Sequence, residues 1–247
     1  MIDTAMILAA GFGSRLRPLT DRLPKPLIEV AGKPLIAYPL ALARAAGIRD
    51  VVINLHHHGA ALRAALGDGS AYGVSIRYSE EDPILDTGGG ILQARALLGE
   101  ERFVVLNSDS IIDLDLRALV DWHVAQGALA TMVLRPDREA ARFGLVEIDR
   151  GHRVRRLLGR PAAVPEPLTA LMFAGVHVFE PEVFRHMATG TFGIVKQTYP
   201  AMLAAGCPVA GYVYDGYWRV LDTHAGLAEG RYELTAGPSP LTPANRP

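Results

Sequence analysis

Near its start the chain contains an apolar run that leads into a glycine-rich loop, Ala5-Met6-Ile7-Leu8-Ala9-Ala10-Gly11-Phe12-Gly13-Ser14-Arg15. The short apolar run, bounded by glycines, predicts a buried β-strand. Small residues at the end of a strand let backbone amides approach a phosphate closely, and Arg15 adds a fixed charge with several donors. The stretch therefore predicts a strand that ends at a phosphate-binding loop, although a tight structural turn would require the same glycines.

Apolar runs of this kind recur along the chain and alternate with helical patterns up to residue 134. We predict strands at 5–10, 51–54, 74–78, 103–107 and 130–134, and helices at 35–46, 60–66, 91–98 and 116–126. This alternation is typical of βαβ units around a mostly parallel sheet with helices on both faces. We therefore expect an α/β, Rossmann-like core over residues 1–134, with ligands at the carboxyl ends of its strands.

The pattern changes after residue 135. Strand-like pieces at 144–148, 154–158 and 171–179 are separated by loops rich in Gly, Pro and Arg. These features predict a smaller lobe over residues 135–234 that belongs to the same domain and covers the core. Residues 235–247 contain four prolines and no apolar periodicity, so we expect a flexible tail.

Composition excludes several classes of function. The 247 residues include 25 basic and 26 acidic side chains, a net charge of −1 that gives no field for binding nucleic acid. Cys207 is the single cysteine, which excludes an internal disulfide or a cysteine-rich zinc site. No basic residue precedes the short apolar run at the start and no apolar run approaches the roughly 20 residues of a membrane helix, so we expect neither an export signal nor a membrane span. We expect a cytoplasmic protein that acts as a monomer or small homo-oligomer.

Two common phosphate-loop motifs are excluded by single residues. A dinucleotide-binding GxGxxG would need glycine where Leu16 stands, and a Walker A lysine would need Ser or Thr where Pro34 follows Lys33. Lys25 is unusual because it stands between two prolines, which stiffen the backbone on both sides. A lysine presented in this way suits phosphate binding, and a solvated loop lysine would show the same pattern.

Four segments together resemble the signature of the sugar-1-phosphate nucleotidyltransferases, the nucleotide-sugar pyrophosphorylases. They are residues 8–27 (LAAGFGSRLRPLTDRLPKPL), 29–36 (EVAGKPLI), 86–90 (DTGGG) and 107–109 (NSD). Within this family, the chain length and the stretch 67–90 are most similar to the N-acetylmuramate-1-phosphate uridylyltransferases of peptidoglycan recycling. The resemblance covers the first half of the chain and is weaker beyond residue 135.

The resemblance implies an enzyme that joins an NTP and a sugar 1-phosphate and releases pyrophosphate. Such a reaction needs alignment and charge neutralisation more than proton transfer. By the family pattern, Arg15 holds the leaving phosphates, Lys25 bridges the α-phosphate and the attacking phosphate, and Asp109 binds Mg²⁺. The implied nucleotide-binding residues are Leu8, Ala9, Ala10, Gly11, Gly13, Ser14, Arg15, Lys25, Thr87, Gly88 and Asp109. Gly88 would meet the base edge through its backbone, and a structural turn at the same glycines is compatible with that role.

The implied sugar-phosphate contacts lie in the second half of the chain. The family has a Glu-Lys-Pro segment where this chain reads Gly159-Arg160-Pro161, so an arginine replaces the lysine and the glutamate is missing. The residues at places where the family contacts the sugar phosphate are Gly144, Arg160, Gly175 and Lys196. A surface lysine is the alternative interpretation of Lys196.

The second metal ligand departs from the usual pattern. Many family members carry an aspartate two residues after a tryptophan, whereas here that position holds Val220 and the aspartate is Asp222, four residues after Trp218. This spacing is similar to that of the glucose-1-phosphate cytidylyltransferases. We predict that Asp109 and Asp222 share Mg²⁺, the alternative being that Asp222 only caps the helix that follows.

The leading functional prediction is uridylyl transfer to N-acetylmuramate 1-phosphate. Guanylyl transfer to mannose or heptose 1-phosphate, and cytidylyl transfer, remain open because backbone groups are expected to read the base. A catalytically silent homologue that binds a nucleotide sugar is the alternative from another class. Because Arg15, Lys25 and Asp109 are all present, the sequence favours an active enzyme.

Overall fold

The structure is a computed structural model that describes residues 2–137, 140, 144–161 and 164–247. Within these residues nine strands form one mixed sheet, and two small two-stranded sheets lie beside it. The strands of the large sheet are β1 (Thr4–Leu8), β4 (Asp50–Leu55), β5 (Ser75–Glu80), β6 (Phe103–Asn107), β8 (Ala130–Arg135), β9 (Leu145–Ile148), β10 (Val154–Leu157), β11 (Thr169–Phe179) and β12 (Val209–Val213). The helices are α1 (Ala37–Ala45), α2 (Gly59–Leu66), α3 (Asp86–Gln93), α4 (Arg95–Leu98), α5 (Leu116–Ala125), α7 (Tyr199–Ala204) and α8 (His224–Thr235).

The strand order places the first strand at the centre of the core. The order is β10-β9-β11-β6-β1-β4-β5, and β8 joins the sheet through β11 and pairs in turn with β12. β1 runs parallel to β4 and β6, and β4 runs parallel to β5. β11 runs antiparallel to β6, so the two halves of the chain share one continuous sheet. The expected α/β class with a mostly parallel, Rossmann-like core is confirmed.

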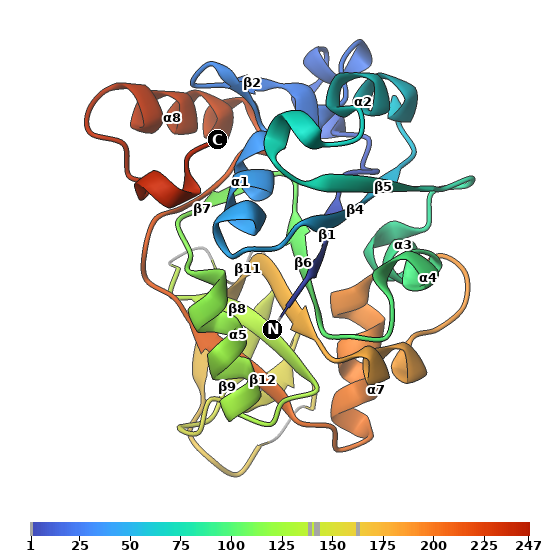
Figure 1. Ribbon diagram of the computed structural model, residues 1–247. Coiled ribbons are helices and arrows are strands. Elements are labelled where there is room, and N and C mark those ends of the chain that lie inside the picture. Colours follow the sequence, from blue (N-terminus) through green and yellow to red (C-terminus); the bar gives the residue numbers. More distant parts are fainter. Residues whose placement is uncertain (1, 138–139, 141–143, 162–163) are drawn as a thin grey trace.

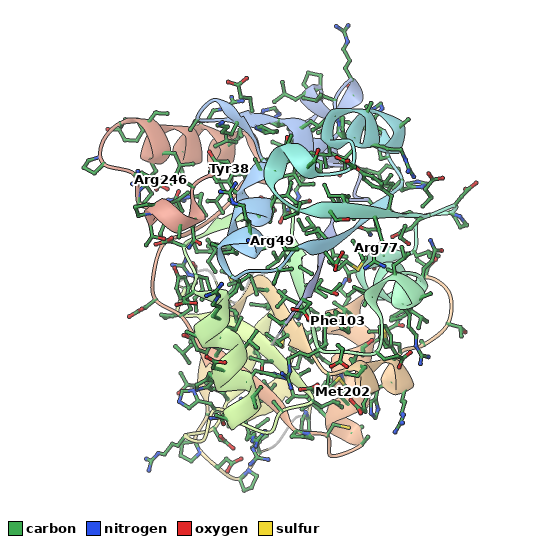
Figure 2. All side chains as sticks on the ribbon, viewed as in Figure 1. Tyr38, Arg49, Arg77, Phe103, Met202 and Arg246 are labelled. Atoms are coloured by element: carbon green, nitrogen blue, oxygen red, sulfur yellow. The ribbon has the colours of Figure 1, made fainter. Side chains whose placement is uncertain are left out.

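Helices cover both faces of this sheet (Figure 1). Ala5 and Ile7 of β1 point to one face, where they pack with residues of α1, α2 and α5. Met6 points to the other face and packs with residues of α3, α4 and α7. Two of the side chains buried on that second face, Phe103 and Met202, are labelled in Figure 2. The alternation along β1 follows from the two-residue period of a strand, which sends neighbouring side chains to opposite faces.

The C-terminal segment differs from the flexible tail that its composition predicts. Residues 237–247 lie against the body of the protein, where Leu241 is buried in a third apolar cluster beneath α8. One oxygen of the Asp113 side chain accepts hydrogen bonds from the Thr242 N–H (2.9 Å) and from Asn245 Nδ2 (2.8 Å). These contacts depend on Asp113, more than a hundred residues away in sequence, which a local composition argument does not consider.

No helix within the described ranges combines the length and the apolar character that crossing a membrane would need.

Candidate active site

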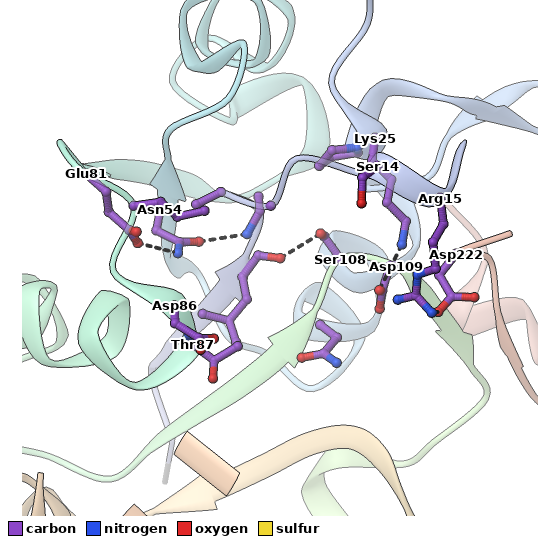
Figure 3. Close-up of a pocket in the computed structure, with 18 residues that line it drawn as sticks. Ser14, Arg15, Lys25, Asn54, Glu81, Asp86, Thr87, Ser108, Asp109 and Asp222 are labelled. Carbon is purple, nitrogen blue, oxygen red and sulfur yellow. Dashed lines mark hydrogen bonds and ion pairs between the residues drawn. The ribbon is translucent and has the colours of Figure 1, made fainter. Parts of the chain in front are cut away.

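The expected nucleotide site is a cavity of about 280 Å³ at the carboxyl ends of the central strands. Figure 3 shows the side chains that line it, with the glycine-rich loop on one side and the start of α3 on another. The lining residues are Leu8, Ala9, Ala10, Gly11, Gly13, Ser14, Arg15, Lys25, Pro26, Asn54, Glu81, Ile84, Asp86, Thr87, Asn107, Ser108, Asp109 and Asp222. All the predicted nucleotide-binding residues except Gly88 are among them.

The conformation of the glycine-rich loop explains its composition. Gly13 has a φ of +61°, and a Cβ there would lie 2.8 Å from the Cγ2 atom of Thr20. The Thr20 hydroxyl donates a hydrogen bond to the Gly13 carbonyl (2.9 Å), which fixes the bend. At Gly11, by contrast, an added Cβ would meet no atom within 4 Å. Gly11 lines the cavity, so its backbone is accessible to a ligand there.

Two ion pairs stand at one end of the cavity. Lys25 Nζ lies 2.9 Å from Asp109 Oδ2, and Arg15 Nη1 lies 2.6 Å from Asp222 Oδ2 (Figure 3). The Lys25 side chain is 11% exposed, whereas that of Arg15 is 65% exposed. Each cation predicted to hold phosphate is thus paired with a carboxylate predicted to hold metal. A polyphosphate that enters this end meets both positive charges together.

Asp222 reaches the site through a small antiparallel sheet formed by β7 (Ser110–Ile112) and β13 (Trp218–Val220). Directly after β13, the Leu221 N–H donates to the Asp109 carbonyl (2.8 Å), which brings the next residue, Asp222, beside Asp109. The N-cap of α8 is Thr223, whose hydroxyl accepts from the Gly226 N–H (3.1 Å). The capping role that was the alternative for Asp222 therefore belongs to its neighbour.

A second cavity, of about 270 Å³, adjoins the first. Asn107, Asp109 and Asp222 line both cavities, so the two meet at the pair of carboxylates. The second cavity is also lined by Gly144, Gly175, Lys196, Trp218 and Val220, among others. A ligand in one cavity can therefore touch a ligand in the other at the aspartates.

Comparison with known proteins identifies the family. The sequence profile described as "Nucleotidyl transferase" matches residues 4–236. The chain belongs to the nucleotidyl transferase family. It is 39% identical over 233 residues to N-acetylmuramate alpha-1-phosphate uridylyltransferase of Neisseria meningitidis, covering 92% of this chain and 96% of that one. It is 36% identical over 246 residues to mannose-1-phosphate guanylyltransferase of Mycobacterium tuberculosis, covering 98% of this chain and 68% of that one.

Solved structures support the fold. A putative glucose-1-phosphate thymidylyltransferase from Bacillus anthracis superposes with a TM-score of 0.79 at 24% identity, covering 92% of this chain and 93% of that one. A UDP-glucose pyrophosphorylase from Acinetobacter baumannii superposes with a TM-score of 0.77 at 21% identity, covering 97% and 96%. The resemblance read from the sequence is confirmed, and this nucleotidyl transferase belongs to a family of enzymes.

Three of the four residues predicted to contact the sugar phosphate come together in this nucleotidyl transferase. Gly144, Gly175 and Lys196 line the second cavity, with Gly175 in a bulge of β11 at a φ of +85°. Arg160 does not join them, because it lines a separate groove beside α7. Residues 157–160 form a tight turn that directs Leu158 to the second cavity and Arg160 to the groove.

Gly88 is the one predicted nucleotide-binding residue that does not line the first cavity. The structure begins α3 at Asp86, so the DTGGG segment is the first part of a helix and not a loop before it. The N–H of Gly88 donates to the Phe192 carbonyl (2.9 Å), and a Cβ at Gly88 would overlap the Phe192 ring. Close packing against Phe192 therefore explains this glycine.

Seven lining residues were not among the predicted site residues, namely Pro26, Asn54, Glu81, Ile84, Asp86, Asn107 and Ser108. Asn54 is the one polar residue of β4 after Asp50, and Glu81 directly follows β5. Polar residues at the carboxyl ends of two neighbouring parallel strands are a signal that could have identified both. Asp86 has a φ of +59°, which is unusual for a residue with a side chain.

Proposed function

We propose that this nucleotidyl transferase joins UTP to N-acetylmuramate 1-phosphate and releases pyrophosphate. The observation that carries the general reaction is the meeting of two cavities at Asp109 and Asp222, beside Lys25 and Arg15. The specific substrates are supported by the relative at 39% identity, whose length this chain nearly matches.

In the proposed reaction the NTP occupies the first cavity and the sugar 1-phosphate the second. A phosphate oxygen of the sugar 1-phosphate forms a bond to the α-phosphorus, and the bond from that phosphorus to the bridging β-phosphate oxygen breaks. Pyrophosphate leaves with the electron pair. The residues of this chain hold the two phosphates in line and neutralise their charge, which are the main requirements of phosphoryl transfer.

The cations would act by exchanging partners. Lys25 and Arg15 are paired with carboxylates in the structure, and phosphate oxygens would take the place of those carboxylates. Lys25 is held rigidly by its two prolines and is mostly buried, so it suits the charge shared between two reacting phosphates. Arg15 is far more exposed and suits the outgoing pyrophosphate at the mouth of the cavity.

The carboxylates fit the Mg²⁺ that the family pattern implies. Asp109 and Asp222 offer hard oxygen ligands at the junction of the cavities, and Mg²⁺ in proteins is held by one or two carboxylates together with substrate phosphates. Asp109 and Asp222 would hold the ion, which would supply positive charge to the phosphates.

The test is pyrophosphate release, measured with four NTPs against a panel of sugar 1-phosphates that includes N-acetylmuramate, mannose, heptose and glucose. We expect the highest kcat/KM with UTP and N-acetylmuramate 1-phosphate. The variant Lys25→Ala should release pyrophosphate much more slowly than wild type. Lys33→Ala is its matched control, because Lys33 lies in the short strand β3 (Lys33–Pro34) and lines neither cavity. Nucleotide-sugar binding without turnover of any pair would refute the enzyme and favour a silent binding protein.

A guanylyltransferase for mannose 1-phosphate is the second candidate. The relative of that name from Mycobacterium tuberculosis is 36% identical over nearly the whole of this chain. The same panel separates the two candidates, since higher kcat/KM with GTP and mannose 1-phosphate would replace the first proposal by the second.

A further inference from the structure

The C-terminal segment is held by three hydrogen bonds to one carboxylate oxygen. Asp113 Oδ1 accepts from the Thr242 N–H (2.9 Å), from the Thr242 hydroxyl (3.0 Å) and from Asn245 Nδ2 (2.8 Å). Asn245 is 8% exposed and also donates to the Leu114 carbonyl (3.3 Å). Leu241, which is 3% exposed, is the apolar contact of the same segment. We call Asp113, Leu241, Thr242 and Asn245 the C-terminal clasp.

The clasp lies at one end of the small sheet of β7 and β13, and the two active-site carboxylates lie at the other end. Asp113 directly follows β7, and its N–H donates to the carbonyl of Tyr217, just before β13 (3.0 Å). Asp109 directly precedes β7, and its carbonyl accepts from the Leu221 N–H (2.8 Å). The four steps of extended chain from Asp109 to Asp113 span roughly 13 Å, so the clasp acts on the site from a distance.

The sheet between these two ends is too small to hold Asp222 in place by itself. It contains three residue pairs. An isolated two-stranded sheet is marginally stable at best in water, so its geometry depends on the groups that pack against it. Because Asp222 follows β13 by two residues, its position depends on the same groups.

Leu241 supports this sheet from its buried side. It belongs to the third apolar cluster, which also contains Ile111 of β7, Leu221 after β13 and Leu227 of α8. Leu221 is 0% exposed and directly precedes Asp222. Figure 1 shows the C-terminus beside α1 and α8. A smaller side chain at position 241 would leave a cavity in the cluster that holds Leu221, and neighbouring groups relax toward such a cavity.

The clasp affects the active site only through the protein, not by direct contact with a ligand. None of its four residues lines the first or the second cavity, whereas Asp222 lines both. The family profile ends at residue 236, so Leu241, Thr242 and Asn245 lie beyond the matched residues. A segment outside the family profile is therefore attached to the strands that bring Asp222 to Asp109.

We propose that the C-terminal clasp positions Asp222 for binding Mg²⁺, so that Asp113, Leu241 and Asn245 are positioning residues of the metal site. Mg²⁺ requires near-ideal octahedral geometry with ligands at about 2.0–2.1 Å, so a small displacement of one carboxylate lowers affinity. The proposal rests on the proposed function to the extent that Asp222 binds the metal. The clasp residues supply no group to the reaction.

The unmodified protein provides the first test. Coupling between two sites is reciprocal, so a clasp that favours metal binding must itself be favoured when metal binds. Hydrogen exchange of the Thr242 N–H, which is bonded to Asp113, is measured with the preferred NTP alone and with the same NTP and Mg²⁺. We expect Mg²⁺ to slow this exchange by about tenfold. An unchanged exchange rate would overturn the proposal.

Two full-length variants disrupt the clasp through different contacts. Leu241→Ala removes the apolar contact, and Asn245→Asp keeps the side-chain volume but places a second carboxylate against Asp113. Each should raise the Kd for Mg²⁺, titrated calorimetrically with the preferred NTP present, by about tenfold. The Kd for NTP in EDTA should change by less than about twofold, because no clasp residue lines the nucleotide cavity. Leu241→Met conserves volume and should bind Mg²⁺ within about twofold of wild type.

Leu66→Ala is the matched control for Leu241→Ala. Leu66 is also 3% exposed, belongs to a different apolar cluster and lines neither cavity. It should lower the melting temperature as Leu241→Ala does, while the Kd for Mg²⁺ stays within about twofold of wild type. Titrations are made well below each melting transition, on variants that circular dichroism shows to be folded. Should Leu241→Ala fail to fold, Asn245→Asp and the exchange of the wild type decide.

Failure of the clasp and failure of the proposed function are distinguishable. A wild-type protein that binds no NTP would refute the proposed function. A wild-type protein that binds Mg²⁺ together with NTP, with folded clasp variants of unchanged Mg²⁺ affinity, would refute the clasp alone. An equal loss of Mg²⁺ affinity in Leu66→Ala would also refute it, because the effect would then follow from lower stability in general.

Discussion

Replacing Asp222 by asparagine separates a metal ligand from a structural aspartate. The substitution keeps the volume of the side chain and removes its charge. Thr223 caps α8, so neither Asp222→Asn nor Asp222→Ala should disturb the helix. If Asp222 binds the metal ion, both variants should lose activity together, whereas a capping residue would tolerate asparagine.

The structure predicts that Asp222→Asn has a small effect on stability and a large effect on metal binding. Asp222 is paired with Arg15, whose side chain is 65% exposed, and an ion pair with so exposed a partner contributes about 0–1 kcal/mol to folding. The melting temperature should therefore fall by about 4 °C at most. The apparent affinity for Mg²⁺ in the presence of NTP should fall by about 100-fold, because one of two carboxylate ligands is lost.

Without metal, the affinity of Asp222→Asn for NTP should not fall. Asp222→Asn releases Arg15 from its carboxylate and adds one positive charge to the cavity, so NTP should bind at least as tightly as to wild type when EDTA is present. Calorimetric titration of NTP with and without Mg²⁺ measures both effects. Asp21→Asn, which removes a carboxylate from a surface pair outside the cavities, serves as the control. Full Mg²⁺-dependent activity in Asp222→Asn would refute the metal assignment.

The remaining predictions concern catalysis, pH and packing. Lys25→Ala should lower kcat by about 100-fold while changing the Kd for NTP much less, since Lys25 is proposed to act on charge shared in the transition state; unchanged kcat at saturating substrates would contradict this. Burial lowers the pKa of His177 to about 3, below its usual value near 6.5, so protonation favours the unfolded chain. Stability from this group is therefore present above pH 6.5 and is lost on acidification, by up to about 1.4 kcal/mol per pH unit; in thermal scans from pH 8 to 5, His177→Phe/Tyr199→Phe should show a smaller fall. Gly88→Ala should lower the melting temperature, because the new Cβ would overlap the Phe192 ring. An unchanged melting temperature would contradict the inference that close packing against Phe192 requires glycine at this position.

Local sequence patterns predicted most of the helices and strands of the core. The run 103–107 forms β6 with the predicted bounds, and the predicted helix 116–126 is α5 (Leu116–Ala125) to within one residue. The glycine-rich loop and Asp109 also line one cavity, as their positions at the ends of strands predict, and Lys25 joins them as the family resemblance implies. These features depend on periodicity, on proline and glycine geometry and on position at a strand end, all of which are properties of neighbouring residues.

Other features were decided by partners distant in sequence. The pairing of Trp218 with Ile112 across β13 and β7 brings Asp222 beside Asp109, and no local pattern contains that pairing. The position of Arg160 depends on a tight turn at 157–160, which places Leu158 in the second cavity and Arg160 in a separate groove.

The three glycines at residues 88–90 show most clearly that local sequence does not determine which distant residues come into contact. The sequence by itself determined that small residues stand there, and the resemblance suggested contact with a base. Tertiary structure assigned them different neighbours: Phe192 at Gly88, Gly190 at Gly89, and the side chains of Glu81 and Asn54 at Gly90. The physical reason is that a glycine is required wherever another group comes too close for a Cβ, and which group comes close depends on how distant segments pack.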